Sequence, residues 1–147
     1  MQNVIKPNLF KYLCLFSIVY LVVLMTISFA MNLLEIKEIP GLTTTIIMIC
    51  AAYTAKLFVD NEGRAPHKKE QKILSAGGLV SSYIVSILLT IIYSIFLGMD
   101  LGVYVSLFIE MPLLLALPIL LFISACYYLA FYIVFGKVAQ NMADKIK

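Results

Sequence analysis

Only a few residues of this chain have a type and a setting suited to chemistry, and Glu110 is the foremost of them. It lies in the stretch Phe108-Ile109-Glu110-Met111-Pro112, beside long apolar segments. A carboxyl that faces the interior of a helix bundle can carry a proton or a cation. An acid just before a helix more often caps the helix and interacts with its dipole. Glu110 is therefore either an interfacial cap, which we favour, or an ion or proton site.

The other reactive side chains lack the partners that catalysis or metal binding needs. Cys14, Cys50 and Cys126 are far apart and show no Cys-x-x-Cys spacing, which is typical of small buried apolar residues. His67 has no neighbouring His, Cys or paired carboxylate at ligand spacing. The chain has no Gly-x-Ser-x-Gly, His-Glu-x-x-His or glycine-rich phosphate motif. We therefore expect no metal, no cofactor and no enzymatic activity.

A stripe of small residues recurs at every fourth position of one apolar segment. Its members are Gly78, Ser82, Ser86, Thr90, Ser94 and Gly98. Small residues at this spacing let helix backbones approach closely, and their hydroxyls can form hydrogen bonds across the contact. The stripe is either a packing surface inside the protein's own bundle or a docking surface for a partner protein or a second copy.

A polar segment in the middle of the chain carries a cluster of basic residues beside one acid. The cluster consists of Asp60, Arg64, Lys68, Lys69 and Lys72. Each basic side chain near anionic lipid headgroups contributes about 1 kcal/mol, so lipid contact alone explains the cluster. A cytoplasmic protein partner is the second interpretation. Nucleic acid is not an expected partner, because the basic residues are few and no aromatic residues lie among them.

Long apolar runs must position these residues. The chain has 147 residues, of which 63% are hydrophobic and 13% charged, and its mean hydropathy is +1.01. Four runs nearly free of charge, Tyr12–Leu34, Leu42–Val59, Leu79–Leu97 and Pro112–Phe135, would extend about 27 to 36 Å as helices, which matches a bilayer core. Backbone amides in lipid must be satisfied within their own segment, so these runs must be helices.

The sequence therefore predicts an all-α integral membrane bundle that forms a single domain over residues 1–147. The expected transmembrane helices cover about 10–34, 42–59, 76–98 and 112–138. A short segment over 103–110 is expected at the membrane interface, and one or two helical turns over 67–74 should lead into the third span.

The basic residues predict the orientation. Every Lys and Arg except Lys37 lies before the first run, in or beside the second connection, or after the fourth run. Cytoplasmic segments are enriched in Lys and Arg. Both termini and the central loop are therefore expected in the cytoplasm.

The central loop resembles that of a family of small bacterial four-helix membrane proteins. The resemblance rests on the pattern F-x-D-x-x-G-R-x-P-x-x-x-E, which starts at Phe58 and ends at Glu70, together with chain length and span number. It implies a bacterial inner membrane but no activity. In architecture alone, the chain is similar to immunity proteins against pore-forming bacteriocins, which implies binding to a toxin within the membrane.

These observations favour a non-enzymatic inner-membrane protein that binds a protein partner by helix packing, of the immunity or accessory-subunit type. The expected partners are the lipid bilayer and a membrane protein, either a toxin or a larger complex, or a second copy of the chain. The alternative is a small transporter or channel subunit that uses Glu110. Four-helix multidrug transporters use an acid in the first helix, and Tyr12–Leu34 contains none.

Overall fold

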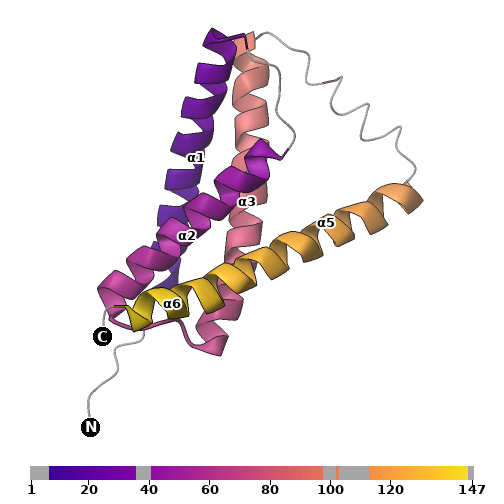
Figure 1. Ribbon diagram of the computed structural model, residues 1–147. Coiled ribbons are helices and arrows are strands. Elements are labelled where there is room, and N and C mark those ends of the chain that lie inside the picture. The colour runs from indigo at the N-terminus through magenta and orange to yellow at the C-terminus, as the bar shows by residue number, and fades with distance from the viewer. Residues whose placement is uncertain (1–6, 36–40, 98–101, 103–112, 146–147) are drawn as a thin grey trace.

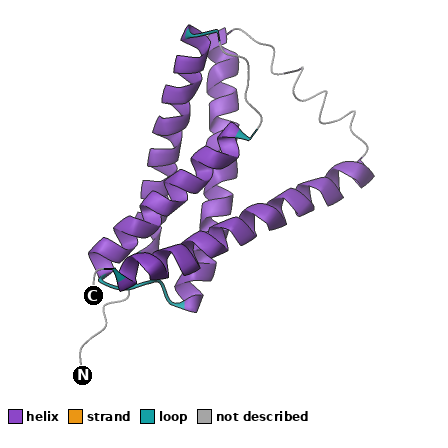
Figure 2. Ribbon diagram, viewed as in Figure 1, coloured by secondary structure: helices purple, strands orange, loops and turns teal. Residues whose placement is uncertain are grey.

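The computed structural model describes residues 7–35, 41–97, 102 and 113–145, and within these ranges the chain is helical without a strand (Figure 2). The elements in chain order are α1 (Leu9–Leu33), α2 (Leu42–Glu62), α3 (Lys68–Leu97), α5 (Leu113–Ile133), the π-helical turn η1 (Val134–Val138) and α6 (Ala139–Asp144). Gly98, Glu110 and the segment 103–110 lie outside the described residues.

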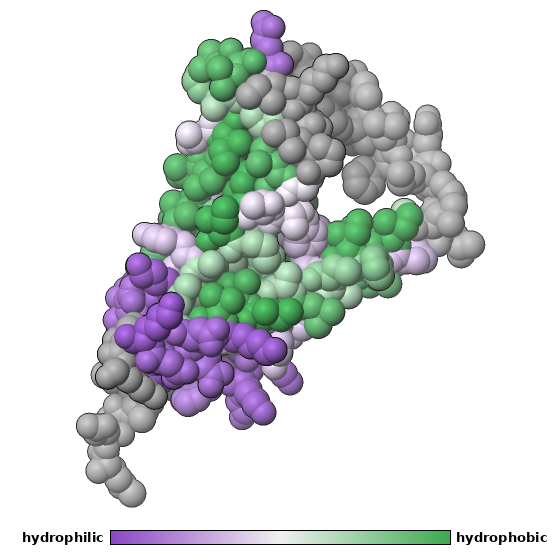
Figure 3. Space-filling view, viewed as in Figure 1, coloured by the Kyte–Doolittle hydropathy of each residue, from purple (hydrophilic) through white to green (hydrophobic). Residues whose placement is uncertain are grey.

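Four helical stretches are long and apolar enough to cross a membrane. They are Leu9–Leu33, Leu42–Glu62, Lys68–Phe96 and Ala116–Asp144. The predicted all-α class with four spans is therefore confirmed. Hydrophilic residues gather where α2 ends, α3 begins and α6 lies (Figure 3). We call this end of the molecule the basic end.

The first two helices lie close to the predicted ranges, and the second ends at a glycine. α2 continues to Glu62, and Gly63 then adopts φ +64°, a left-handed conformation that favours glycine. The Gly63 N–H donates to the Val59 carbonyl at 2.8 Å and closes the last turn. The connection to α3 is therefore a tight turn, and the loop expected over residues 60–75 is much shorter.

The third helix begins at Lys68 instead of residue 76. Glu70 explains this difference, because its carboxylate accepts the His67 N–H at 2.8 Å and so satisfies a free amide of the first turn. The same carboxylate forms two hydrogen bonds with the Arg64 guanidinium, at 2.8 and 2.9 Å. The polar residues before the apolar run thus form the first turns of α3.

The last span contains a wide turn. α5 passes into the π-helical turn η1 and continues as α6. Gln71 of α3 donates from Nε2 to the Tyr132 carbonyl at 2.6 Å, immediately before η1. A Cβ atom at Gly136 would collide with the Gln71 amide, so the absence of a side chain at Gly136 makes room for this contact. The predicted single helix over 112–138 is thus interrupted where α3 contacts it.

An aromatic core holds the helices together near the basic end. Phe16 of α1 is edge-on to Phe131 of α5, with ring centroids 5.6 Å apart, and both are fully buried. Tyr12 packs on Phe58 of α2 at 4.9 Å. Edge-to-face and tilted pairs at these distances are favourable beyond the area that they bury. The tightest packing of the described residues therefore lies in one half of the bundle.

The fourth span diverges from the other three. Figure 1 shows α6 lying across α2 near the basic end, whereas the N-terminal end of α5 lies well apart from the far ends of α1 and α3. Side chains along this part of α5 are exposed, among them Phe122 at 71%. The bundle is thus closed at the basic end and open at the opposite end.

Candidate helix-docking groove

The predicted stripe of α3 begins as an internal packing surface. Gly78 is buried, and a Cβ atom there would lie 3.2 Å from the Phe131 ring, so α5 approaches α3 at this glycine. Ser82 is also buried, at 6% exposure. Further along, Ser86 is half-buried, Thr90 is exposed and Ser94 is buried. The part of the stripe nearest the basic end thus packs inside the protein's own bundle.

The hydroxyls of the stripe form hydrogen bonds within their own helix. Ser82 donates to the Leu79 carbonyl, Thr90 to Ser86 and Ser94 to Thr90, at 2.8 to 2.9 Å. The hydroxyl contact between α3 and α5 instead joins Tyr83 and Ser124, whose oxygens are 2.8 Å apart. The small side chains of the stripe thus leave room for close packing, and the hydroxyls of Ser82, Thr90 and Ser94 are satisfied within α3.

A second set of small residues lines an open groove between α1 and α3. The groove encloses about 680 Å³ in the half of the bundle nearest the basic end. Its small lining residues are Cys14, Ser17, Ala76, Gly77 and Ser81. Larger apolar side chains, including Phe10, Ile18, Ile73 and Val80, flank them and are at least half exposed. Small residues beneath an apolar rim allow another helix to approach closely in a membrane.

Gly77 brings the two walls of the groove together. A Cβ atom at this position would lie 2.5 Å from a methyl carbon of Leu13 on α1. Leu13 therefore lies directly against the α3 backbone. Ala76 and Ser81, in contrast, leave space in the groove and are exposed and half-buried, respectively.

The sequence contains a signal for this groove that was not predicted as a separate surface. Gly77 and Ser81 form a small-x-x-x-small pair one residue before Gly78 and Ser82. The two pairs point in directions about 100° apart on a helix, so one can be buried while the other stays open. The pair of Gly77 and Ser81 is shorter than the stripe from Gly78 to Gly98, so its spacing is the weaker signal.

The basic cluster separates into a paired arginine and free lysines. Arg64 is 27% exposed and bound to Glu70, and its guanidinium lies 5.8 Å from the centre of the Phe58 ring. The hydrogen bonds with Glu70 raise the pKa of Arg64, although partial burial opposes them. Asp60, Lys68, Lys69 and Lys72 are exposed. The residues of the loop pattern thus build the α2–α3 turn, and the lysines remain available to lipid headgroups.

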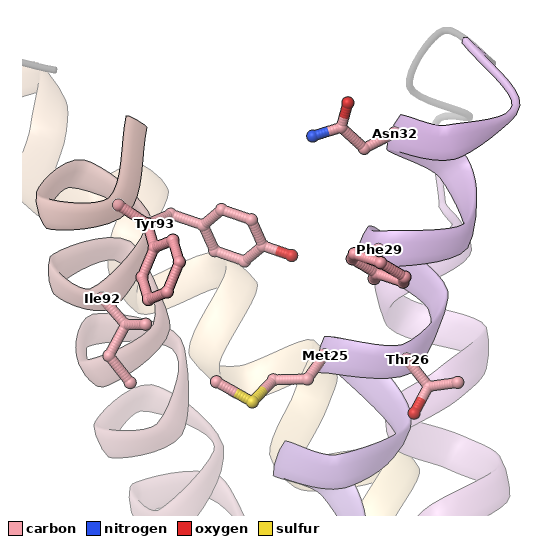
Figure 4. Close-up of a pocket in the computed structure, with 7 residues that line it drawn as sticks. Met25, Thr26, Phe29, Asn32, Ile92 and Tyr93 are labelled. Carbon is pink, nitrogen blue, oxygen red and sulfur yellow. The ribbon is translucent and has the colours of Figure 1, made fainter. Parts of the chain in front are cut away.

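A further apolar pocket of about 550 Å³ lies between α1 and α3 away from the basic end (Figure 4). Met25 and Phe29 of α1 face Ile92 of α3 across it. The Asn32 amide and the Tyr93 hydroxyl supply its polar groups and extend into the space between the helices. The described lining residues include no acid or base, so this pocket offers apolar contact and neutral hydrogen-bonding groups.

The described residues contain no group of three or more His, Cys, Asp or Glu side chains that could hold a metal ion. Cys50 is buried, whereas Cys14 and Cys126 are exposed. No family model, curated protein or solved structure matches this chain. The groove and the pockets are therefore interpreted from their own geometry.

Proposed function

We propose that this chain is a non-enzymatic, multi-pass protein of a bacterial inner membrane that binds a membrane-protein partner through the groove between α1 and α3. The observation that supports this proposal is the open groove, whose small lining residues are Cys14, Ser17, Ala76, Gly77 and Ser81. Lipid tails are as apolar as a helix surface, so close packing on small residues is what distinguishes a partner helix from lipid. The loop pattern from Phe58 to Glu70 supports the bacterial inner membrane.

The proposed partner is an apolar transmembrane helix that presents its own small residues to the groove. A pore-forming toxin held in a nonconducting state would make the chain an immunity protein, and a larger membrane complex would make it an accessory subunit. Both uses need the same contact and no reacting group. The immunity version is tested first because it has a direct cellular readout.

The test is protection of a sensitive host against the toxin encoded beside this gene. Ala76→Phe fills the groove, and we expect it to abolish protection at unchanged protein level in the membrane. Ala125→Phe is the matched control, because Ala125 is equally an exposed alanine of a membrane helix, on α5 away from the groove. Equal protection by wild type and Ala76→Phe would exclude the groove as the docking surface.

Unchanged killing in the presence of the wild-type chain would exclude the immunity version. The accessory-subunit version then predicts a defined complex in mild detergent that survives Ala125→Phe and dissociates with Ala76→Phe. A complex that both variants retain would contradict docking in the groove.

A further inference from the structure

A polar hollow lies between α1, α2 and α3 within the membrane-spanning part of the bundle. It encloses about 280 Å³, and its lining includes Ser28, Thr43, Ser86, Thr90 and Tyr93. A second hollow of about 190 Å³ shares Leu24, Ser28 and Thr43 with it and continues to Met31 and Leu42. Because α1 ends at Leu33 and α2 begins at Leu42, the lining of both hollows lies in the half of the bundle away from the basic end.

The described residues that line this hollow are rich in hydroxyls and include no charged side chain. The Thr90 hydroxyl donates to the Ser86 carbonyl at 2.9 Å. The side-chain hydroxyls of Ser28, Thr43 and Tyr93 form no hydrogen bond with the part of the chain that the structure describes. Lipid tails offer no hydrogen bond to such groups, and a polar group in an apolar setting without a partner is unfavourable.

Tyr20 adds an independent observation at the inner side of the hollow. Its side chain is fully buried, and its hydroxyl has no hydrogen-bond partner among the described residues. The Ser86 side chain is within interaction range of this hydroxyl, although the two groups lack the geometry of a hydrogen bond, and Ser86 also lines the hollow. A buried polar atom without a protein partner is typically satisfied by an ordered water.

We propose that the hollow is a hydrated crevice that opens at the end opposite the basic end and holds water as far as the Tyr20 hydroxyl. Its volume greatly exceeds the roughly 10 to 15 Å³ that one water needs, and several hydroxyls supply the polar partners that buried water requires. Water beside Ser86 gives the Tyr20 hydroxyl the well-aligned partner that Ser86 itself does not supply. The described residues of its lining offer hydroxyls and no charged side chain, which suits water better than an ion. This inference is independent of the groove and of any partner.

The test is the reactivity of single cysteines in the full chain in native membrane vesicles, after replacement of Cys14, Cys50 and Cys126 by alanine. Ser86→Cys and Ser28→Cys change one atom each and place a thiol in the crevice from different helices. A charged, membrane-impermeant thiol reagent needs water and an ionised thiol. We expect both thiols to react about tenfold faster or more than thiols surrounded by lipid, because only they ionise in water.

Ile84→Cys on α3 and Val22→Cys on α1 are the matched controls, because Ile84 and Val22 are 52% and 54% exposed on the outer surfaces of the same helices. Lys69→Cys marks the basic end. We expect Ser86→Cys and Ser28→Cys to react from the side of the membrane opposite to Lys69→Cys. Rates equal to those of the controls would show that lipid fills the hollow and would overturn the proposal. Reaction from the Lys69 side would do the same.

Discussion

Gln71 connects α3 to the last span through a single hydrogen bond to a backbone carbonyl. In a continuous α-helix the Tyr132 carbonyl would accept the N–H of Gly136. Tyr132 lies just before the π-helical turn, where the donors shift along by one residue, and its carbonyl accepts the Gln71 amide at 2.6 Å. The Gln71 side chain is buried, at 8% exposure. The contact therefore joins two helices and also satisfies a backbone group of the wide turn.

This arrangement predicts coupled effects of Gly136→Ala and Gln71→Ala. Each single change should lower the free energy of unfolding by about 1 to 3 kcal/mol, because each removes the hydrogen bond to the Tyr132 carbonyl. In the Gln71→Ala background, Gly136→Ala should be neutral or stabilising, because its methyl group no longer meets the amide and alanine favours the helix. Unfolding by SDS in mixed micelles measures all four proteins. Additive losses would contradict the contact.

Sequence reasoning could not identify these residues. Gln71 lies among lysines in a polar stretch, where it is indistinguishable from a solvated side chain. Gly136 follows an aromatic-rich helix end and carries no sign of a wide turn. The contact joins residues 61 positions apart, and only the packing of α3 against the last span brings them together.

At the scale of elements, the start of α3 depends on capping and charge pairing, not on apolar residues. The first turn contains Lys68, Lys69 and Glu70, and only Glu70 has partners, in Arg64 and the His67 amide. A carboxylate at the third position of a helix stabilises its N-terminus through the free amides and the dipole. Helix therefore begins before the segment that lipid requires to be helical.

Proline substitutions distinguish this start from one at residue 76. Lys68→Pro should leave folding nearly unchanged, because the first helical position has no intrahelical N–H bond to lose. Lys72→Pro should destabilise by about 3 kcal/mol or more, because position 72 lies inside the helix. Thermal unfolding in detergent compares the two variants, which both replace an exposed lysine. Equal tolerance of both prolines would contradict the observed start.

The same reasoning shows which elements the sequence could predict. Apolar runs revealed all four spans because a bilayer of fixed thickness imposes length and composition together. Outside the bilayer no such constraint acts, so the turns expected over 67–74 were kept separate from the third span, and the fourth helix was ended at residue 138. Spacing left the stripe from Gly78 as either an internal packing surface or a docking surface, and it could not show that its neighbour at Gly77 and Ser81 would border a groove.

At the scale of the whole molecule, the distribution of charge predicts orientation. Hydrophilic residues gather at one end, where the α2–α3 turn and α6 lie (Figure 3). Fusion of a phosphatase that is active only outside the cytoplasm should therefore give activity at Glu38 and none at Lys69. A fluorescent reporter that folds only in the cytoplasm should give the opposite pattern. Phosphatase activity at Lys69 would contradict the proposed orientation.

The divergence of α5 is the feature of the whole molecule that no sequence pattern indicated. Apolar side chains on α5 have nearly equal free energy whether they face lipid or another helix. Hydropathy therefore does not predict the angle between α5 and the other helices. The aromatic contact between Phe16 and Phe131 fixes one half of the last span. The Tyr127 hydroxyl shares a hydrogen bond with Thr44 at 2.9 Å. On the N-terminal side of Tyr127, the large apolar side chains of α5 are exposed.

The wide turn at η1 has a consequence for how this chain tolerates a change in length. A π turn holds about one residue more than an α turn, so it absorbs an insertion while the faces of the helix on either side keep their alignment. Loss of one residue within Val134–Val138 would leave Phe131 and Ala139 on the surfaces that they now share with α1 and α2. The Gln71 amide would then face a continuous α-helix in place of the wide turn. The extra residue is thus dispensable for helix alignment, and it lies where the last span receives the Gln71 side chain.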